Sequence, residues 1–280
     1  MRRSDRVAAL AAGVATAVLF GFVALPILAI FLKVSPSELV SQLGSHVARQ
    51  ALLVSIRSSL IAVAVIVLFG TPAAFILGTK RFRGSRVLTA FLELPLVLPP
   101  AVAGIALFAA FGRFGLMGGA LRFFGIELPF TQAAVVMALT YVALPFYTRQ
   151  AVAAFASMDQ QLLGASRTLG AGRARTFFRV ALPLARQGLS AGAALAWARA
   201  LGEFGATILF AGSLAGKTQT LPLAIYEQFG AGNLDGALAM SALLVVVSAG
   251  LFVGFRLFVR NRGLEPEGAG WGLRSSSTIA

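Results

Sequence analysis

Residues 58–79 read SSLIAVAVIVLFGTPAAFILGT, a run of 22 residues without a charged side chain. An α-helix needs about 20 predominantly apolar residues to cross the hydrocarbon core of a bilayer. The run lacks the strict alternation of apolar and polar residues that marks a strand of a membrane β-barrel. It therefore predicts a transmembrane helix, and the apolar residues just before it extend the span to 51–79.

Five further runs of similar length predict additional spans. They lie at 7–32, 87–111, 128–148, 184–212 and 236–260. The first follows Met1-Arg2-Arg3, as the apolar core of a signal peptide would, but it is too long for one, so we interpret it as a retained helix. The sequence thus predicts an all-α, polytopic membrane protein with six transmembrane helices.

The overall composition supports a chain whose solvent is lipid. Hydrophobic residues make up 58% of the 280 residues, charged residues only 12%, and the mean hydropathy is +0.85. Soluble domains carry about 25% charged residues, so a soluble enzyme or a disordered regulator is a poor fit. The chain has no cysteine, which excludes disulfides and cysteine-bound zinc. His46 is the single histidine, and we expect a surface residue and no metal site.

The net charge of +14 has two candidate explanations, a nucleic-acid partner or an uneven distribution across a membrane. Seventeen of the 24 Lys and Arg residues fall at the two termini and in the loops after the second and fourth spans, against five in the other loops. Cytoplasmic loops are the ones enriched in Lys and Arg. Both termini are therefore predicted to be cytoplasmic, which requires an even number of spans, and no nucleic-acid partner is expected.

This topology divides the chain into a membrane domain and a tail. Residues 1–262 form the predicted transmembrane domain, and residues 149–183 form its longest cytoplasmic loop. Residues 263–280 are rich in Gly and Ser and predict a disordered cytoplasmic tail.

A short helix of about three turns is predicted inside the cytoplasmic loop. Ser157 followed by Gln160 is a capping-box pattern, and Asp159 in the first turn favours the helix dipole. Gly170 or Gly172 can supply a left-handed C-terminal cap. Such a helix can lie on the lipid surface or dock on a partner protein, and its residues alone leave both interpretations open.

The pattern Gly164-Ala165-Ser166-x3-Gly170-x9-Val180-x-Leu182-Pro183 resembles the EAA loop of ABC-importer permeases, Glu-Ala-Ala-x3-Gly-x9-Ile-x-Leu-Pro. The spacing is the same throughout, although Gly164 replaces the Glu and Ser166 replaces the second Ala. The resemblance implies that the short helix is a coupling helix that docks into a cleft of an ATPase subunit. The implied coupling residues are Gly164, Ala165, Ser166, Gly170, Val180, Leu182 and Pro183.

Three other stretches resemble the molybdate and sulfate permeases of this superfamily. They are ELPLVLPPAVAG at 93–104, ALGEFGAT at 200–207, and Gly212 followed by GKTQTLPLAIY at 216–226, the last being more similar to the molybdate branch. The resemblance implies a permease that moves an oxyanion by alternating access. Molybdate is the first expectation, and sulfate, thiosulfate or tungstate are the alternatives.

The same resemblance implies the partners. Two copies of a separate ATPase subunit would bind ATP and Mg, and a periplasmic or lipid-anchored oxyanion-binding protein would deliver the substrate. Two permease copies would form a homodimer in the inner membrane of a bacterium or archaeon. This chain would bind no cofactor and is not expected to be an enzyme, because GSLAGKT at 212–218 lacks the first glycine of a phosphate loop, with Ala at position 211.

Six residues inside the predicted spans are candidates for the pathway or its gate. They are Pro99, Pro100, Arg199, Gly202, Glu203 and Gly205. Charge at mid-membrane costs at least about 2.5–3.5 kcal/mol, so Arg199 and Glu203 predict either a gate or a mutually neutralised structural pair. The prolines predict a break that faces the pathway or a plain kink, and the glycines predict tight packing or a hinge.

Two other classes of membrane protein remain as alternatives. A secondary transporter driven by an ion gradient should show internal repeats, and none is evident in this sequence. A purely structural membrane subunit would need no ATPase partner. Loss of ATPase binding on deletion of residues 157–170 would exclude both.

Overall fold

The structure, a computed structural model, describes residues 3–80 and 82–261, so the tail predicted at 263–280 lies outside the described residues. Helices make up nearly all of the described chain, which contains no β-strand. The elements are α1 (Arg3–Lys33), α2 (Pro36–Gly44), α3 (His46–Thr79), α4 (Ser85–Val97), α5 (Pro100–Phe111), α6 (Gly118–Phe123), α7 (Gln132–Ala156), α8 (Gln160–Thr168), α9 (Arg173–Thr176), the π-helical turn η1 (Phe177–Ala181), α10 (Leu182–Leu201), α11 (Gly205–Ala211), α12 (Leu221–Gly230) and α13 (Leu234–Asn261).

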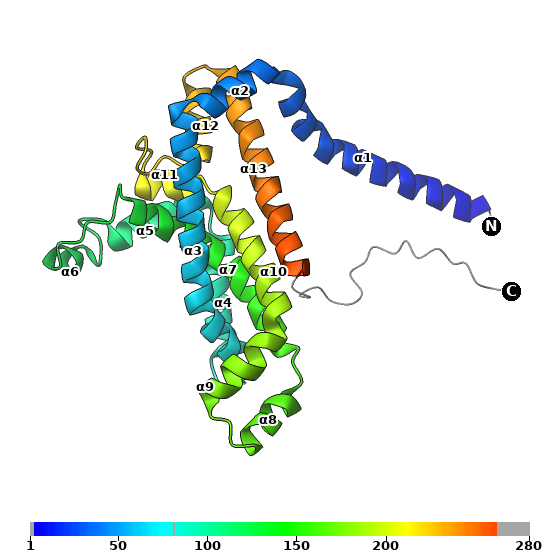
Figure 1. Ribbon diagram of the computed structural model, residues 1–280, viewed down its shortest axis with the longest axis vertical. Coiled ribbons are helices and arrows are strands. Elements are labelled where there is room, and N and C mark those ends of the chain that lie inside the picture. The colour runs from blue at the N-terminus through cyan, green and yellow to red at the C-terminus, as the bar shows by residue number, and fades with distance from the viewer. Residues whose placement is uncertain (1–2, 81, 262–280) are drawn as a thin grey trace.

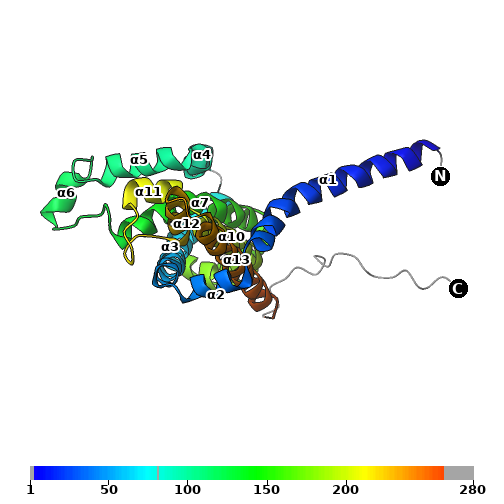
Figure 2. The same ribbon diagram turned by 90° about the horizontal axis from the view of Figure 1, so that it is seen from above.

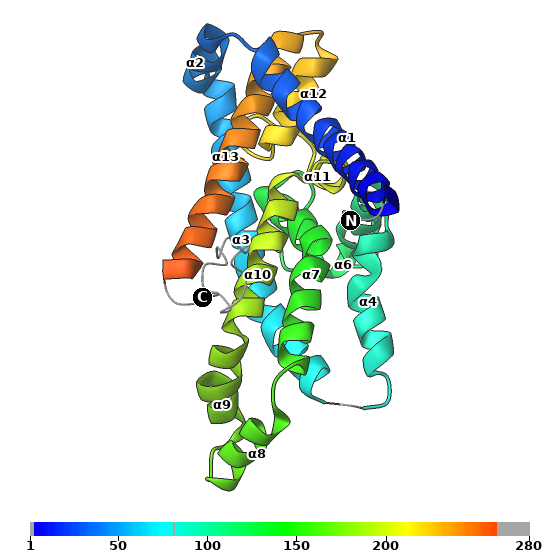
Figure 3. The same ribbon diagram turned by 90° about the vertical axis from the view of Figure 1, so that its right-hand side faces the viewer.

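Four long helices, α3, α7, α10 and α13, form the body of the molecule (Figures 1 and 3). The helices α8 and α9 lie at one end of this body, as does the link between α3 and α4, whereas α2 and α12 lie at the opposite end. Helix α1 leads away from the body, and no residue of its apolar segment is buried (Figures 1 and 2). The segments predicted to be cytoplasmic between spans therefore gather at one end.

Small residues let the central helices approach closely. A Cβ at Gly70 of α3 would lie 3.0 Å from the Tyr147 ring of α7, and one at Gly78 would lie 2.8 Å from the Phe155 Cβ. On the other side of α7, a Cβ at Gly192 of α10 would lie 3.1 Å from the Tyr147 carbonyl oxygen. In lipid, which is as apolar as the side chains, such close packing is a main source of helix association.

The described residues contain three helices long and apolar enough to cross a membrane by themselves, namely α1, α3 and α13. Two bent pairs of helices raise this number to five if each pair counts as one span. Helix α7 begins four residues after the start of the span predicted at 128–148 and continues to Ala156, but it is less apolar and falls in neither group. The all-α membrane fold is thus confirmed, while the number of six spans stays a prediction.

Both bent pairs correct a span that was predicted as one helix. The segment 87–111 divides into α4 and α5 with a bend of 114° between them, because Pro99 and Pro100 provide no amide hydrogens and Pro100 begins a new helix. The segment 184–212 divides into α10 and α11 with a bend of 62° across residues 202–204. The proline break was signalled by the sequence, and the second break was signalled only by its glycines.

The helix predicted to start at Leu184 begins earlier. The chain is helical from Arg173 to Leu201, with the π-helical turn η1 in its path and Pro183 in the first turn of α10. In the π-helical turn the Leu182 amide donates to the Phe177 carbonyl, five residues back. The wider turn accommodates a proline, whose ring would otherwise meet the carbonyl of Arg179 four residues before it.

Candidate functional site

The two helix breaks lie against each other, although they are far apart in the sequence. A Cβ on Gly205, the first residue of α11, would lie 2.8 Å from the Pro100 Cβ and 3.2 Å from the Ala101 nitrogen at the start of α5. Real Cβ atoms essentially never approach another atom within 3.0 Å. Only glycine therefore fits at position 205 without a shift of one helix.

A second glycine, Gly104, continues this contact along α5. A Cβ there would lie 2.8 Å from the Ala206 carbonyl oxygen and 2.9 Å from the Leu209 Cβ of α11. The two short helices thus run from the paired breaks with their backbones in close contact. Gly104 was part of the quoted 93–104 stretch but was not singled out, because its partner could not be seen in the sequence.

Both carboxylate oxygens of Glu203 make polar contacts at the second break. The Arg199 guanidinium lies 2.6 Å from Glu203 Oε2, and the Ala206 backbone amide donates to Glu203 Oε1 at 2.8 Å. Arg199 and Glu203, predicted to be a gate or a mutually neutralised pair, are thus in contact. Glu203 itself, however, lies in the non-helical link and not on a helix face, and its carboxylate accepts from one free amide in the first turn of α11, that of Ala206.

The opposite charges of Arg199 and Glu203 compensate each other. The Glu203 side chain is 1% exposed and that of Arg199 is 26% exposed, so a lone charge at Glu203 would carry a large desolvation cost. The short ion pair and the amide hydrogen bond offset this cost. In this structure Arg199 is bound to Glu203, so its charge is balanced and not free for an anion.

The two glycines that flank Glu203 differ in their surroundings. A Cβ on Gly202 would meet only the Ala198 carbonyl oxygen, at 3.9 Å, which is ordinary van der Waals contact. Gly205, in contrast, is in contact with Pro100. Of the residues predicted for the pathway, the structure thus brings together Pro100, Gly205, Glu203 and Arg199, and it leaves Gly202 with open space.

At the far end of the molecule, α8 forms the helix that was predicted in the cytoplasmic loop. The predicted capping box is wrong, because Asp159 is the N-cap and accepts a hydrogen bond from the Gln161 amide at 2.8 Å. Ser157 instead caps the end of α7, which is longer than predicted, and its hydroxyl donates to the Ala154 carbonyl. Gly170, with φ of 82°, takes the left-handed conformation expected after the helix.

Helix α8 is anchored by two residues on one face. Leu163 is 3% exposed, and the half-buried Ser166 shares a hydrogen bond of 2.8 Å with Thr176 of α9, itself buried. The serine that departs from the family pattern thus has a specific partner, Thr176, which the sequence analysis missed. Gly164 and Ala165 lie on the exposed side of the helix, available to a partner.

Residues 180–183 join this anchor to the rest of the molecule. Val180 belongs to the π-helical turn, and Leu182 and Pro183 begin α10, which carries Arg199 in its last turn, two residues before its end. The loop residues are therefore connected to the paired breaks through one helical path.

Sequence analysis also missed an ion pair between α4 and α7. The Arg149 Nε lies 3.7 Å from Glu93 Oε1. The side chain of Arg149 is largely exposed, so the pair contributes little to stability. Glu93 lies in the span predicted at 87–111 and Arg149 at the start of the predicted cytoplasmic loop, and no local pattern indicated that they meet.

Most of the chain is similar to transport proteins from other organisms. It is 44% identical over 235 residues to the "Molybdenum transport system permease protein ModB" of Mycobacterium tuberculosis, covering 83% of this chain and 88% of the relative. It is 41% identical over 207 residues to the ModB protein of Escherichia coli, covering 70% and 90%. Among solved structures, a bacterial alginate ABC transporter bound to its periplasmic protein matches with a TM-score of 0.70, 15% identity, and coverage of 92% and 96%, which supports the fold alone.

The family described as "Binding-protein-dependent transport system inner membrane component" matches residues 67–262, a range that includes the α8 loop and both helix breaks. The resemblance found in the loop motif is thereby confirmed. This chain belongs to the family of inner membrane components of binding-protein-dependent transport systems.

Proposed function

We propose that this chain is the permease subunit of an ATP-driven importer and that it moves molybdate across the inner membrane of a bacterium or archaeon. The observation that carries this proposal is the 44% identity to a molybdenum transport permease over 83% of the chain. Sulfate, thiosulfate and tungstate remain the alternative substrates. Specificity would rest largely on the binding protein that delivers the anion.

The paired helix breaks are the part of the chain best suited to line the pathway. Non-helical backbone at membrane depth is tolerated where it is covered by protein or lines a water-filled space. Both breaks carry such backbone, and they lie in contact at Pro100 and Gly205. In a homodimer, α5 and α11 of two copies would face each other across one pathway that opens to alternate sides.

We assign the energy source to partner subunits. Two ATPase copies would bind ATP and Mg, since the segment 212–218 of this chain follows α11 and does not have the glycine spacing of a phosphate loop. A periplasmic or lipid-anchored oxyanion-binding protein would dock on the outward side. The membrane domain would comprise residues 1–262 with six spans, both termini in the cytoplasm and lipid around it.

The contacts from α8 to the breaks suggest how ATP hydrolysis is coupled to transport. Movement of α8 would pass through the Ser166–Thr176 hydrogen bond into the helical path from Arg173 to Leu201. At the end of that path, Arg199 contacts Glu203. A displacement at the ATPase would therefore reach the second break without crossing a flexible loop.

Ala165→Glu tests this coupling. The Ala165 side chain is exposed on α8, so the substitution leaves the fold intact and introduces bulk and charge only into the ATPase interface. We expect the variant permease to insert normally, to retain less of the co-purified ATPase, and to lose most ATP-driven molybdate uptake. Gln160→Glu is the matched control, because it adds the same residue in the first turn of α8, where a negative charge is favourable.

Normal ATPase retention and uptake in Ala165→Glu would mean that α8 lies on lipid. An ion-gradient transporter predicts a different result, because no ATPase would co-purify even with the wild-type permease. The co-purification also tests the topology, because an ATPase can reach α8 only from the cytoplasm.

A further inference from the structure

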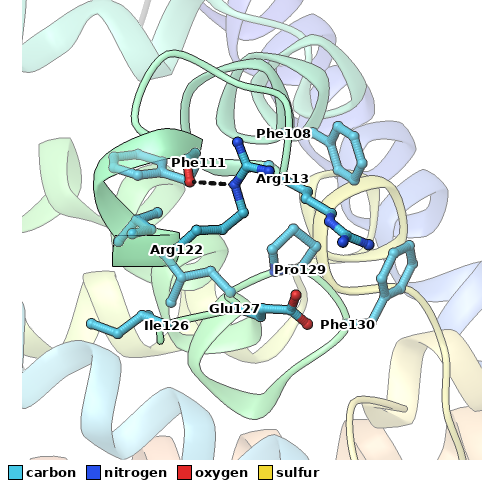
Figure 4. Close-up of a pocket in the computed structure, with 12 residues that line it drawn as sticks. Phe108, Phe111, Arg113, Arg122, Ile126, Glu127, Pro129 and Phe130 are labelled. Atoms are coloured by element: carbon cyan, nitrogen blue, oxygen red, sulfur yellow. Dashed lines mark hydrogen bonds between the residues drawn. The ribbon is translucent and has the colours of Figure 1, made fainter. Parts of the chain in front are cut away.

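A cavity of about 170 Å³ lies in the segment that joins α5 to α7 (Figure 4). A single water needs only about 10–15 Å³ by this measure, so the cavity has room for a small polyatomic ion. Aromatic side chains form much of its wall. Those labelled in Figure 4 are Phe108, Phe111 and Phe130.

Three charged side chains line the same cavity. In Figure 4 the Arg122 guanidinium lies toward the upper left, the Arg113 guanidinium toward the right, and the Glu127 carboxylate below them. The Arg122 Nε donates to the Gly118 carbonyl at 3.3 Å, which fixes the direction of its guanidinium. Among the described residues, neither arginine has an acidic partner within ion-pair distance. The cavity therefore carries an excess of positive charge.

The cavity lies at the C-terminal ends of the two short helices, α5 and α11. Helix α5 runs from the break at Pro100 to Phe111, which lines the cavity. Helix α11 runs from Gly205 to Ala211, and a Cβ on the next residue, Gly212, would lie 2.8 Å from the ring of Phe130. The paired breaks thus lie at one end of α5 and α11, and the cavity lies at the other.

We propose that Arg113 and Arg122 form a weak binding site for a tetrahedral oxyanion. Guanidinium groups match the geometry of such oxyanions, and a charged cleft with apolar walls concentrates counter-ions. Glu127 repels the same anion and keeps its binding weak, so that the site releases it. That the occupant is a transported anion rests on the proposed function, since the phosphate of a lipid headgroup presents the same chemistry.

The test is a titration of the purified permease–ATPase complex in a phosphate-free sugar detergent, without its binding protein. Molybdate and the soluble short-chain lipid dihexanoyl phosphatidylglycerol are titrated separately by calorimetry. We expect at least one of them to bind saturably, and Arg113→Gln and Arg122→Gln each to weaken that binding at least about fivefold. Glu127→Gln should strengthen it, because it removes the repelling charge.

Arg49→Gln is the matched control. Arg49 is also exposed on the predicted outer side, but its guanidinium donates a hydrogen bond to the Gly44 carbonyl, away from the cavity. Binding of molybdate assigns the site to the transported anion, and binding of the lipid alone assigns it to a headgroup. Absence of both, or equal effects of Arg49→Gln and Arg113→Gln, would overturn the proposal. Uptake by the same complex, measured in vesicles with its binding protein, shows separately whether the importer function holds.

Discussion

Replacing Glu203 with Ala will lower the yield of assembled transporter and reduce molybdate uptake at least about tenfold, equivalent to roughly 1.4 kcal/mol. The change removes the partner of the Arg199 guanidinium and the acceptor of the Ala206 amide, both at the junction of α10 and α11. Removing one partner of a buried pair typically costs about 3–5 kcal/mol, and the partial exposure of Arg199 makes the lower part of that range apply.

A double-mutant cycle separates the two roles considered for this pair. Glu203→Gln keeps an acceptor for the Ala206 amide but leaves Arg199 without a counter-charge. We expect Arg199→Gln combined with Glu203→Gln to restore complex yield and uptake together, because the break is then neutral again. A double variant that assembles fully but does not transport would contradict this and make Glu203 a gating residue.

The second large effect is expected at Gly205. In Gly205→Ala the new methyl group would lie 2.8 Å from the Pro100 Cβ, so α11 and α5 must move apart at their closest point. Overpacking of this kind typically costs about 1–3 kcal/mol. We expect the variant to reach the membrane and to retain its ATPase, while uptake falls to a small fraction of wild type.

Gly202→Ala is the control for this experiment. It lies three residues away, and its new methyl group would meet only the Ala198 carbonyl oxygen at 3.9 Å. Its uptake should stay close to wild type. Equal losses in Gly202→Ala and Gly205→Ala would show that backbone flexibility, and not the contact with Pro100, is what position 205 requires.

The sequence predicted the parts of the fold that depend on local composition. Uncharged runs located the long helices α1, α3 and α13, because crossing a bilayer imposes length and apolarity on each segment by itself. Pro99 and Pro100 located the first break for an equally local reason, the missing amide hydrogens. The left-handed Gly170 after α8 was also predictable.

Features that depend on tertiary contacts could not be predicted. Arg199 and Glu203 were identified as a pair by their spacing, but nothing local indicated that Glu203 would leave the helix and cap α11. The contact of Gly205 with Pro100 joins segments that are distant in the sequence. At the start of α8, Ser157 was predicted as the cap and Asp159 as a first-turn residue, but α7 continues to Ala156 and Asp159 takes the cap position.

Uptake by reconstituted vesicles tests the central claim most directly. The permease is incorporated with its cognate ATPase, ATP is enclosed in the lumen, and the cognate binding protein is supplied outside with radiolabelled molybdate. Our account predicts that molybdate accumulates only when both ATP and the binding protein are present, and that a non-hydrolysable ATP analogue supports no accumulation. Accumulation that ignores ATP and instead follows an imposed proton or sodium gradient would contradict it.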